Sequence, residues 1–549
     1  MQISATSEQH AIPAARVTPQ LFWGVVALSL LLAVVKRYPF LPSGDFPLGE
    51  GGLFVAFSEA IRGHGYRLPD IIQYGGVSIP FAYPPAGFYL AAFVADLTGA
   101  DLLKVYRHLP IALNLLAIPG FCFLAMQYTR ERLIFVCAPL LYAFMPESFI
   151  WQITGGGLPR ALAAVPALFG VGLALRAART GPSIPVALTC GVLVALAMLS
   201  HLEWGIFAAL GVTTAVVTRR RPEWRSLSFL AAAGVVSTVI VAPWLALVLS
   251  RHGLAPFRAS SSASQWSLGT FAKMLLGAQI FVGALTWPAI LGAITAIAKR
   301  DLFAVIWAPV ILLVTPRMGM SSGLAIPTAL LAACGLKAAG DFIERAARGV
   351  SLVRRRWYPS RVLTTMRPAL GDYAAIALLV VVSLIQLTPK IPRMFIEHKV
   401  VAQLDRPTRD AMQWIARNTD AGGRFVIVSD ARFWWGDRIA EWFPYLAQRA
   451  SETTAQGMEW VAPGAFTQRL QEIEDFKSVQ WAAPPLLPEF VQRTYCDVGY
   501  VAMFLLPTSP EYAAFKASEL YAEIYNNGQA AVFKRNTAVD AACRPRSAA

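Results

Sequence analysis

The chain has 549 residues, of which 56% are hydrophobic and only 15% are charged, and its Lys and Arg residues exceed its Asp and Glu residues by 15. Soluble domains typically contain about 25% charged and roughly 45–50% apolar residues. The mean hydropathy of +0.50 therefore excludes a disordered chain, a disulfide scaffold and a purely soluble enzyme. The basic residues lie between apolar blocks, so the positive charge does not indicate nucleic-acid binding. The composition predicts a polytopic membrane protein.

The first apolar segment, Leu21–Val35, follows a polar start and continues into Lys36-Arg37 without a small-residue cleavage site. This pattern predicts a retained transmembrane helix rather than a cleaved signal peptide. Further segments of roughly 14–25 mostly apolar residues can cross a bilayer with tilt or flanking help. These are Leu103–Gln127, Leu133–Ile150, Pro159–Leu175, Ile184–Ser200, Trp204–Thr218, Leu227–Leu249, Ile280–Ala298, Leu302–Thr315, Gly323–Gly340 and Tyr373–Thr388.

The basic connections between these segments test the topology, because Lys and Arg collect in cytoplasmic loops. Placing all of them in the cytoplasm gives a consistent alternation of spans. The apolar run Phe81–Leu97 would invert that alternation if it crossed the membrane, so we expect an interfacial helix there. The result is eleven spans, a cytoplasmic N-terminus and an outward C-terminus. The connections are Arg130/Arg132, Arg176/Arg179, Arg219 to Arg225, Lys299-Arg300 and Lys337 to Arg367.

Two parts follow from the composition: a transmembrane part at 1–388, with its first outer loop at 41–102, and an α/β domain at 389–549. In the second part, Asp410–Asn418 has a helical pattern, and Arg424–Ser429 and Tyr500–Leu505 are strand candidates. Tyr521–Tyr525 and Ala530–Lys534 flank Asn-Asn-Gly, which predicts a hairpin. About 160 residues suffice for one small domain.

The six cysteines do not show the spacing of a zinc site. Four of them lie in apolar segments, where cysteine usually acts as a small hydrophobic residue. Only Cys496 and Cys543 lie in polar sequence, and a disulfide between them requires an extracytoplasmic domain. The sequence leaves that pairing open.

Two acids stand in the first outer loop before an amphipathic helical pattern at Phe54–Ile61. Asp45 or Glu50, held near the membrane surface, could act as a general base toward a hydroxyl acceptor, with partial burial or a cationic partner adjusting its pKa. Alternatively, both acids serve to cap the following helix, whose N-terminus favours negative charge. The spacing alone leaves both interpretations open.

An acid after the first span, an amphipathic helix and then Tyr83-Pro84-Pro85 with aromatic residues resembles the GT-C glycosyltransferases. These include protein O-mannosyltransferases, aminoarabinose transferases of lipid A and oligosaccharyltransferase catalytic subunits. The stretch Asp410–Asn418, followed by RFVIVSD and Trp434-Trp435-Gly436-Asp437-Arg438, resembles the domain after the last span in that family. The resemblance implies a GT-C fold, a sugar donor on polyprenyl phosphate or pyrophosphate, and a catalytic base in the first outer loop. It assigns the base to Asp45, with Glu50 second.

The chain departs from the family pattern at two places. Its two loop acids are five positions apart instead of adjacent, and the second outer loop carries Glu147 and Gly155-Gly156-Gly157-Leu158-Pro159-Arg160 in place of Asp-x-Asp. A divalent ion requires several clustered oxygen ligands. We therefore expect a metal-independent enzyme without a cofactor.

Three arginines are candidates for binding the donor phosphate, because a guanidinium can bind a phosphate bidentately. Arg317 lies between two outer span ends, and Arg160 and Arg258 could have the same role. Pairing with an acid or a lipid headgroup is the alternative for each. His201 and Glu203, at an outward turn, are candidates for substrate binding or are simply solvated.

Further candidates for acceptor or substrate binding combine aromatic rings and charges. They are Tyr83 in the first outer loop and Trp435, Asp437 and Arg438 in the C-terminal domain. Tryptophans that pack the domain onto the membrane surface explain the second group equally well.

We therefore predict an integral glycosyltransferase of the cytoplasmic membrane with an extracytoplasmic, periplasmic C-terminal domain. It moves a sugar from a polyprenyl-phosphate-linked donor to a glycan, lipid or protein acceptor on the outer face. Its partners are that donor, that acceptor and membrane lipids, with no nucleic acid. The alternatives are a transporter or flippase of a lipid-linked or polar solute, and a non-catalytic GT-C-like assembly subunit.

Overall fold

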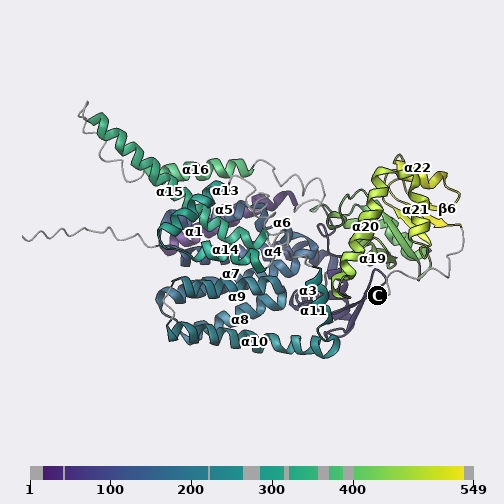
Figure 1. Ribbon diagram of the computed structural model, residues 1–549, viewed down its shortest axis with the longest axis horizontal. Helices are drawn as coiled ribbons and strands as arrows, with labels where there is room; N and C mark the ends of the chain where they lie inside the picture. Colours follow the sequence, from purple (N-terminus) through teal and green to yellow (C-terminus); the bar gives the residue numbers. More distant parts are fainter. Residues whose placement is uncertain are drawn as a thin grey trace, which may run out of the picture.

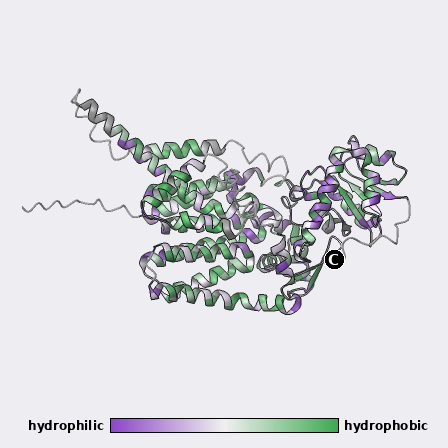
Figure 2. Cartoon of the chain, viewed as in Figure 1, coloured by the Kyte–Doolittle hydropathy of each residue, from purple (hydrophilic) through white to green (hydrophobic). Residues whose placement is uncertain are grey.

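The computed structural model describes residues 17–40, 44–219, 223–263, 285–314, 321–355, 370–387 and 401–536. A bundle of long helices is followed by an α/β unit that lies beyond one end of the bundle (Figure 1). Figure 2 shows hydrophobic residues along the bundle helices and a mixture of hydrophilic and hydrophobic residues in the α/β unit. The protein thus has two parts, a bundle of apolar helices and a more polar α/β unit.

Each predicted apolar segment falls mainly on a helix within the described residues. In the part of the chain that the structure describes, five helices are long and apolar enough to span a membrane, and the pair Arg132–Phe144 and Pro146–Ile153, bent by 77°, would make a sixth. The structure therefore supports an integral membrane protein, while the count of eleven spans stays a prediction. The bundle helices are α1 (Pro19–Arg37), α4 (Leu102–Tyr128), α5 (Arg132–Phe144), α7 (Leu158–Thr180), α8 (Ile184–Ser200), α9 (Leu202–Arg219), α10 (Trp224–His252), α13 (Thr286–Ala298), α14 (Phe303–Val314), α15 (Ser321–Arg355) and α16 (Leu370–Leu387).

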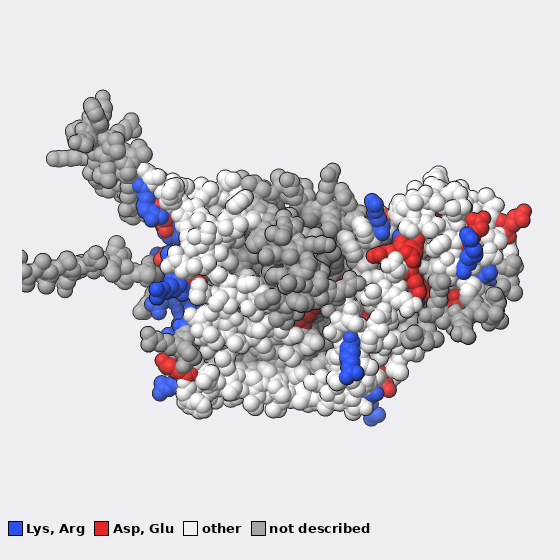
Figure 3. Space-filling model, in the orientation of Figure 1, with Lys and Arg blue, Asp and Glu red and all other residues white. Residues whose placement is uncertain are grey.

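Basic residues bring together the helix ends that lie away from the α/β unit. Arg219, at the end of α9, donates to the carbonyl of Tyr128 (3.1 Å) and to Asp301 (2.9 Å). Arg179, at the end of α7, donates to the carbonyl of Gln127 (2.8 Å). Figure 3 shows Lys and Arg side chains gathered at this end of the bundle. The predicted basic connections that the structure describes thus lie at the same end of the bundle. The predicted alternation of spans requires this arrangement.

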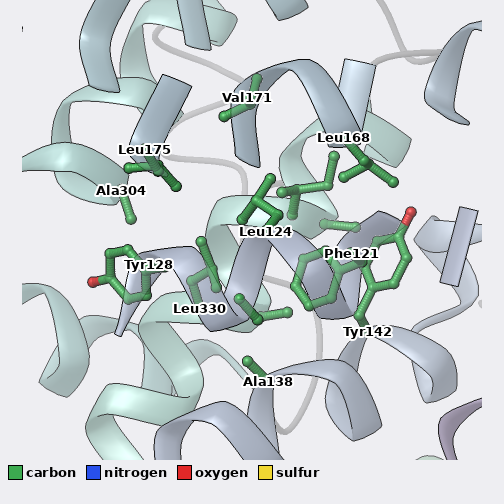
Figure 4. Packing of buried hydrophobic residues seen from close by; sticks show 14 of the residues in the cluster. Phe121, Leu124, Tyr128, Ala138, Tyr142, Leu168, Val171, Leu175, Ala304 and Leu330 are labelled. Atoms are coloured by element: carbon green, nitrogen blue, oxygen red, sulfur yellow. The ribbon is translucent and has the colours of Figure 1, made fainter. Parts of the chain in front are cut away.

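The interior of the bundle is built around α4 and α7. Phe121 of α4 stacks on Tyr142 of α5 with ring centroids 4.2 Å apart, and Leu168 and Val171 of α7 pack beside them (Figure 4). A Cβ at Gly172 would lie 2.6 Å from the ring of Phe123, so glycine permits the close approach of the two helices. This packed pair fixes the loops at its outer ends.

The first outer loop contains α2 (Gly52–Gly63), β1 (Ile71–Tyr74), β2 (Val77–Pro80) and α3 (Ala86–Thr98). The predicted helix at Phe54–Ile61 is confirmed as part of α2. The apolar run Phe81–Leu97 falls mainly on α3, whose 13 residues fall short of the roughly 20 that a span needs, and its interfacial position stays a prediction. The β1–β2 hairpin turns at Gly75-Gly76, both at positive φ, and sequence reasoning missed it.

The α/β unit contains a five-stranded sheet of order β4-β3-β5-β7-β6. β3 is parallel to β4 and β5, whereas β7 is antiparallel to β5 and β6. The predicted helix, both predicted strands and the predicted hairpin are confirmed. The elements are α18 (Arg406–Asn418), β3 (Arg424–Val428), α19 (Arg438–Ala447), β4 (Ala450–Ser451), α20 (Ala465–Ala482), α21 (Leu487–Thr494), β5 (Tyr500–Met503), α22 (Pro510–Ala517), β6 (Tyr521–Asn526) and β7 (Ala531–Arg535).

The cysteines separate into two groups. The four cysteines of the apolar segments, Cys122, Cys137, Cys190 and Cys334, are free, and all except the half-buried Cys334 are fully buried. Cys496 is disulfide-bonded. Cys543 lies outside the described residues.

The α/β unit contacts the first outer loop directly. The Ser451 amide at edge strand β4 donates to the carbonyl of Gly75 in the hairpin turn (3.2 Å). The Gly49 amide donates to the carbonyl of Ala402 (2.8 Å), and the indole of Trp442 donates to the carbonyl of Gly49 (2.7 Å). These contacts place the candidate site at the junction of the two parts.

Candidate functional site

A narrow cleft lies where the first outer loop meets the short helix α6 (Ile150–Ile153) and the α/β unit. The free volume of this cleft is about 10 Å³, which is enough for about one water molecule. A larger ligand therefore requires the surrounding loops to open. The cleft is lined by Gly49, Glu50, Trp151, Trp435, Gly436, Asp437, Arg438, Glu441 and Gln456.

The backbone around Glu50 is held by the short helix η3 (Gly155–Gly157). The Gly155 amide donates to the carbonyl of Leu48 (2.9 Å), and the Gly156 amide donates to the carbonyl of Glu50 (2.7 Å). A Cβ at Gly156 would lie 2.7 Å from Cγ of Glu50, so only glycine allows this approach. The glycine run that replaces Asp-x-Asp is therefore a platform for the Glu50 loop.

Arg160, in the first turn of α7, is the cationic neighbour of Glu50. Its Nη1 lies 3.5 Å from Oε1 of Glu50 and donates to the carbonyl of Trp151 (3.1 Å). Both side chains are partly buried, at 18% and 23% exposed for Arg160 and Glu50. A guanidinium has five N–H donors, so Arg160 can bind the carboxylate and an incoming phosphate oxygen together.

Tyr83 joins the Glu50–Arg160 pair to the turn between α8 and α9. Its ring centroid lies 6.1 Å from that of His201, which ends α8, and 5.6 Å from that of Trp460. Burial raises the pKa of the Tyr83 phenol, with smaller effects from nearby charges. The structure thus gathers sequence-predicted residues from four separate segments. The charged groups acting on the phenol are Arg160, Glu203, Glu459 and Glu50.

Asp45 lies elsewhere and does not line this cleft. Its side chain is 71% exposed and forms a bidentate pair with Arg409 of α18, with N–O distances of 2.9 and 3.1 Å. The guanidinium of Arg409 also lies 5.1 Å from the ring centroid of Phe46. Hydrogen bonds from Arg409 lower the pKa of Asp45 below its ordinary value, which makes Asp45 a weaker base.

The predicted residues of the α/β unit have structural contacts at the cleft. Asp437 is buried, caps α19 by accepting from the Ala440 amide (3.0 Å), and pairs with Lys477 (3.2 Å). Arg438 donates through Nε to the carbonyl of Gln403 (3.3 Å). The Trp435 ring is stacked against Phe433 and packs on the cluster that contains Trp151. Substrate contact by these three residues remains an expectation.

Glu441 of α19 is a residue that sequence reasoning did not single out. Its side chain is 1% exposed, and its carboxylate accepts from the amides of Gly51 (3.0 Å), Gly52 (3.2 Å) and Leu53 (3.2 Å). Burial, followed by the charge of Glu50, raises its pKa to about 7, whereas the three amide hydrogen bonds oppose the shift. No local pattern marks this role, because the partners lie in the first outer loop.

Of the two further arginine candidates, Arg258 does not line this cleft. Arg317 lies outside the described residues. Arg258 lies on α11 (Ala255–Ser262), which packs near Met458–Trp460, and its side chain is exposed. Among the described residues, no group of three or more His, Cys, Asp or Glu side chains is placed to hold a metal ion.

Comparison with solved structures finds proteins that share the fold of this chain. The archaeal oligosaccharyltransferase AglB from Archaeoglobus fulgidus, solved with an inhibitory peptide and a dolichol-phosphate, superposes with a TM-score of 0.56 at 14% identity over 97% of this chain and 76% of its own. ArnT from Cupriavidus metallidurans, in the apo state, gives a TM-score of 0.51 at 17% identity over 93% and 98%. The arabinofuranosyltransferase AftD from Mycobacteria gives 0.55 at 15% identity over 96% and 40%.

These three proteins share the fold of the GT-C superfamily of membrane glycosyltransferases, and this chain has that fold. The fold expected from the resemblance is confirmed. By sequence, the chain matches no protein-family profile and no curated protein. At these identities the likeness concerns the fold, and the roles of individual residues follow from the geometry.

Proposed function

We propose that the protein is a glycosyltransferase that moves a sugar from a polyprenyl-phosphate-type lipid donor to a glycan, lipid or protein acceptor. The observation that carries this proposal is Glu50, which lines a cleft at the junction of the bundle and the α/β unit and pairs with Arg160. The GT-C fold supports it. AglB was solved with a dolichol-phosphate and an inhibitory peptide, and ArnT was solved with undecaprenyl phosphate.

In this proposal Glu50 is the general base. Its carboxylate takes the proton of the acceptor while the acceptor atom forms a bond to the anomeric carbon of the donor. The bond between that carbon and the phosphate oxygen breaks, and the lipid phosphate leaves with the electron pair. Arg160 orients the carboxylate of Glu50 and stabilises the charge on the leaving phosphate. Asp45, the first choice from the resemblance, is exposed and engaged by Arg409, which favours Glu50 for the base.

Tyr83, His201 and Glu203 are proposed to bind the acceptor or the sugar, because the ring of Tyr83 lies near that of His201 and its phenol feels the charges of Arg160, Glu203 and Glu50. Trp435, Asp437 and Arg438, which line the cleft beside Glu50, are proposed to contact the same substrates. Arg258 and Arg317 are further candidates for the donor phosphate. Residues 389–549 are proposed to lie outside the cytoplasmic membrane, with the N-terminus in the cytoplasm and eleven spans between them.

The proposal is tested with the purified full chain in proteoliposomes that contain a radiolabelled polyprenyl-phosphate sugar and a panel of glycan, lipid and peptide acceptors. Formation of a labelled product that is absent with Glu50→Gln supports the glycosyltransferase. Glu59→Gln is the matched control, because Glu59 lies exposed on helix α2, which follows Glu50, and contacts Tyr445. Movement of the labelled lipid between leaflets without product indicates a flippase, and neither activity indicates an assembly subunit.

A further inference from the structure

The N-terminus of α2 is capped by a residue of the α/β unit instead of by its own sequence. Its N-cap residue is Gly51, which has no side chain to accept the first helical amides. Such amides are unsatisfied at a helix start and attract negative charge. The carboxylate of Glu441 fills this position with three hydrogen bonds, to Gly51, Gly52 and Leu53.

Neighbouring contacts hold the same turn from the same side. Trp442 donates its indole N–H to the carbonyl of Gly49 (2.7 Å), and its ring packs edge-on against Phe46 with centroids 4.6 Å apart. Tyr74 of the hairpin donates its hydroxyl to the carbonyl of Glu441. A Cβ at Gly52 would lie 2.7 Å from that hydroxyl, so the fit is tight.

We propose that Glu441 is a positioning residue for Glu50: together with Trp442 it fixes the Gly49–Leu53 turn, so that Glu50 faces Arg160 only while the α/β unit is docked. Glu50 is the residue of this turn that lies between the carbonyl held by Trp442 and the first amide held by Glu441. The turn is therefore restrained on both sides of Glu50. In its catalytic part, this inference rests on the function proposed above.

A purely structural role for Glu441 makes a different prediction. A structural residue supports the fold as a whole, so its loss lowers the thermal stability and the amount of active protein. A positioning residue controls where one side chain points. Its loss slows turnover of the folded protein and leaves donor affinity nearly unchanged, because a small misplacement of a reacting group costs about 100-fold in rate.

Two measurements on the whole protein test whether Glu441 fixes the Gly49–Leu53 turn, with Glu441→Ala and Glu441→Gln as variants. The control is Glu511→Gln, which changes another buried glutamate in the first turn of a helix of the same domain. Hydrogen exchange of peptides covering residues 46–54 reports the turn without any activity assay. We expect exchange about tenfold faster in Glu441→Ala, partial protection in Glu441→Gln, which keeps one acceptor oxygen, and no change in the control.

The second measurement is the steady-state rate of sugar transfer. We expect Glu441→Ala to lower kcat about 100-fold with the donor KM within about twofold, and Glu441→Gln to restore part of the rate. Unchanged exchange at residues 46–54 in Glu441→Ala overturns the inference, as does an equal loss of kcat in Glu511→Gln. If the wild-type protein transfers no sugar, the proposed function fails, and the exchange measurement alone decides whether Glu441 fixes the turn.

Discussion

The carboxylate of Glu50 lies 3.5 Å from the guanidinium of Arg160, although the two residues belong to different outer loops. The short helix η3 brings them together. The amide of Gly156 donates to the carbonyl of Glu50, and Gly156 lies only four residues before Arg160 in the sequence. Asp45 has an equivalent partner in Arg409 but lies exposed and outside the cleft. The two loop acids are therefore chemically distinct.

Glu50→Gln is expected to slow transfer strongly, whereas Asp45→Asn is expected to change it little. Removing a general base costs about 10²–10⁴-fold in rate, so Glu50→Gln should reduce kcat by that amount. Asp45→Asn removes an exposed ion pair, whose contribution to stability is about 0.2–1 kcal/mol, and should leave kcat within about threefold. Initial rates with the lipid-linked donor measure both. Abolished transfer in Asp45→Asn, with near-normal transfer in Glu50→Gln, would return the base to Asp45, as the family resemblance first implied.

Arg160 is expected to act on the departing phosphate. Arg160→Gln removes a donor aimed at the developing charge and should lower kcat about 10²–10³-fold. Arg160→Lys keeps the charge without the planar fork of donors, so it should recover only part of the rate. Arg258→Gln gives the comparison with the other described candidate for the donor phosphate, which is exposed on α11. Equal losses in Arg258→Gln and Arg160→Gln would move the phosphate site away from Arg160.

Local patterns predicted the parts of this fold that depend on neighbouring residues. Apolar length predicted the bundle helices, and the Arg424–Ser429 run and the Asn-Asn-Gly turn predicted β3 and the β6–β7 hairpin. The β1–β2 hairpin was missed, because its strands have four residues each and only Gly75-Gly76 marks the turn. Such short strands give too few positions for an alternating pattern.

The site needed contacts between distant segments that periodicity does not encode. Sequence reasoning proposed Tyr83, Arg160 and His201 because charge or aromatic rings at outer span ends are informative. It ranked Asp45 above Glu50 on the family resemblance, and nothing in the sequence shows that Asp45 pairs with Arg409. It passed over Glu441, because that role exists only when α19 docks on α2.

Gly156→Ala tests the platform beneath Glu50. The added Cβ would lie 2.7 Å from Cγ of Glu50, so the loop must shift or the side chain must turn away from Arg160. We expect a destabilisation of about 1–3 kcal/mol and a larger fractional loss of kcat. Gly63→Ala is the matched control, because a Cβ there meets nothing within 4 Å. Thermal unfolding together with initial rates separates the two effects, and wild-type turnover in Gly156→Ala would rule out the platform.

The buried carboxyl of Glu441 predicts a pH dependence of stability with a definite sign. Its pKa in the folded protein is about 7, above the ordinary value of 4.5, because of burial and the charge of Glu50. The folded state therefore binds more protons than the unfolded state between these values. Its contribution to the free energy of unfolding is fully present below pH 4.5 and is lost as the pH rises through 7, by about 3 kcal/mol at most.

Glu441→Gln removes this titration and supplies the comparison. Four other ionisable groups lie around Glu441. They are Glu50 of the loop, Tyr74 of β1, Tyr445 of α19 and Glu59 of α2, which accepts a hydrogen bond from Tyr445. None of them is altered in the variant. Thermal unfolding of both proteins from pH 5 to pH 8 should show the wild type losing stability relative to Glu441→Gln as the pH rises. Parallel curves would mean that Glu441 does not change its protonation in this range.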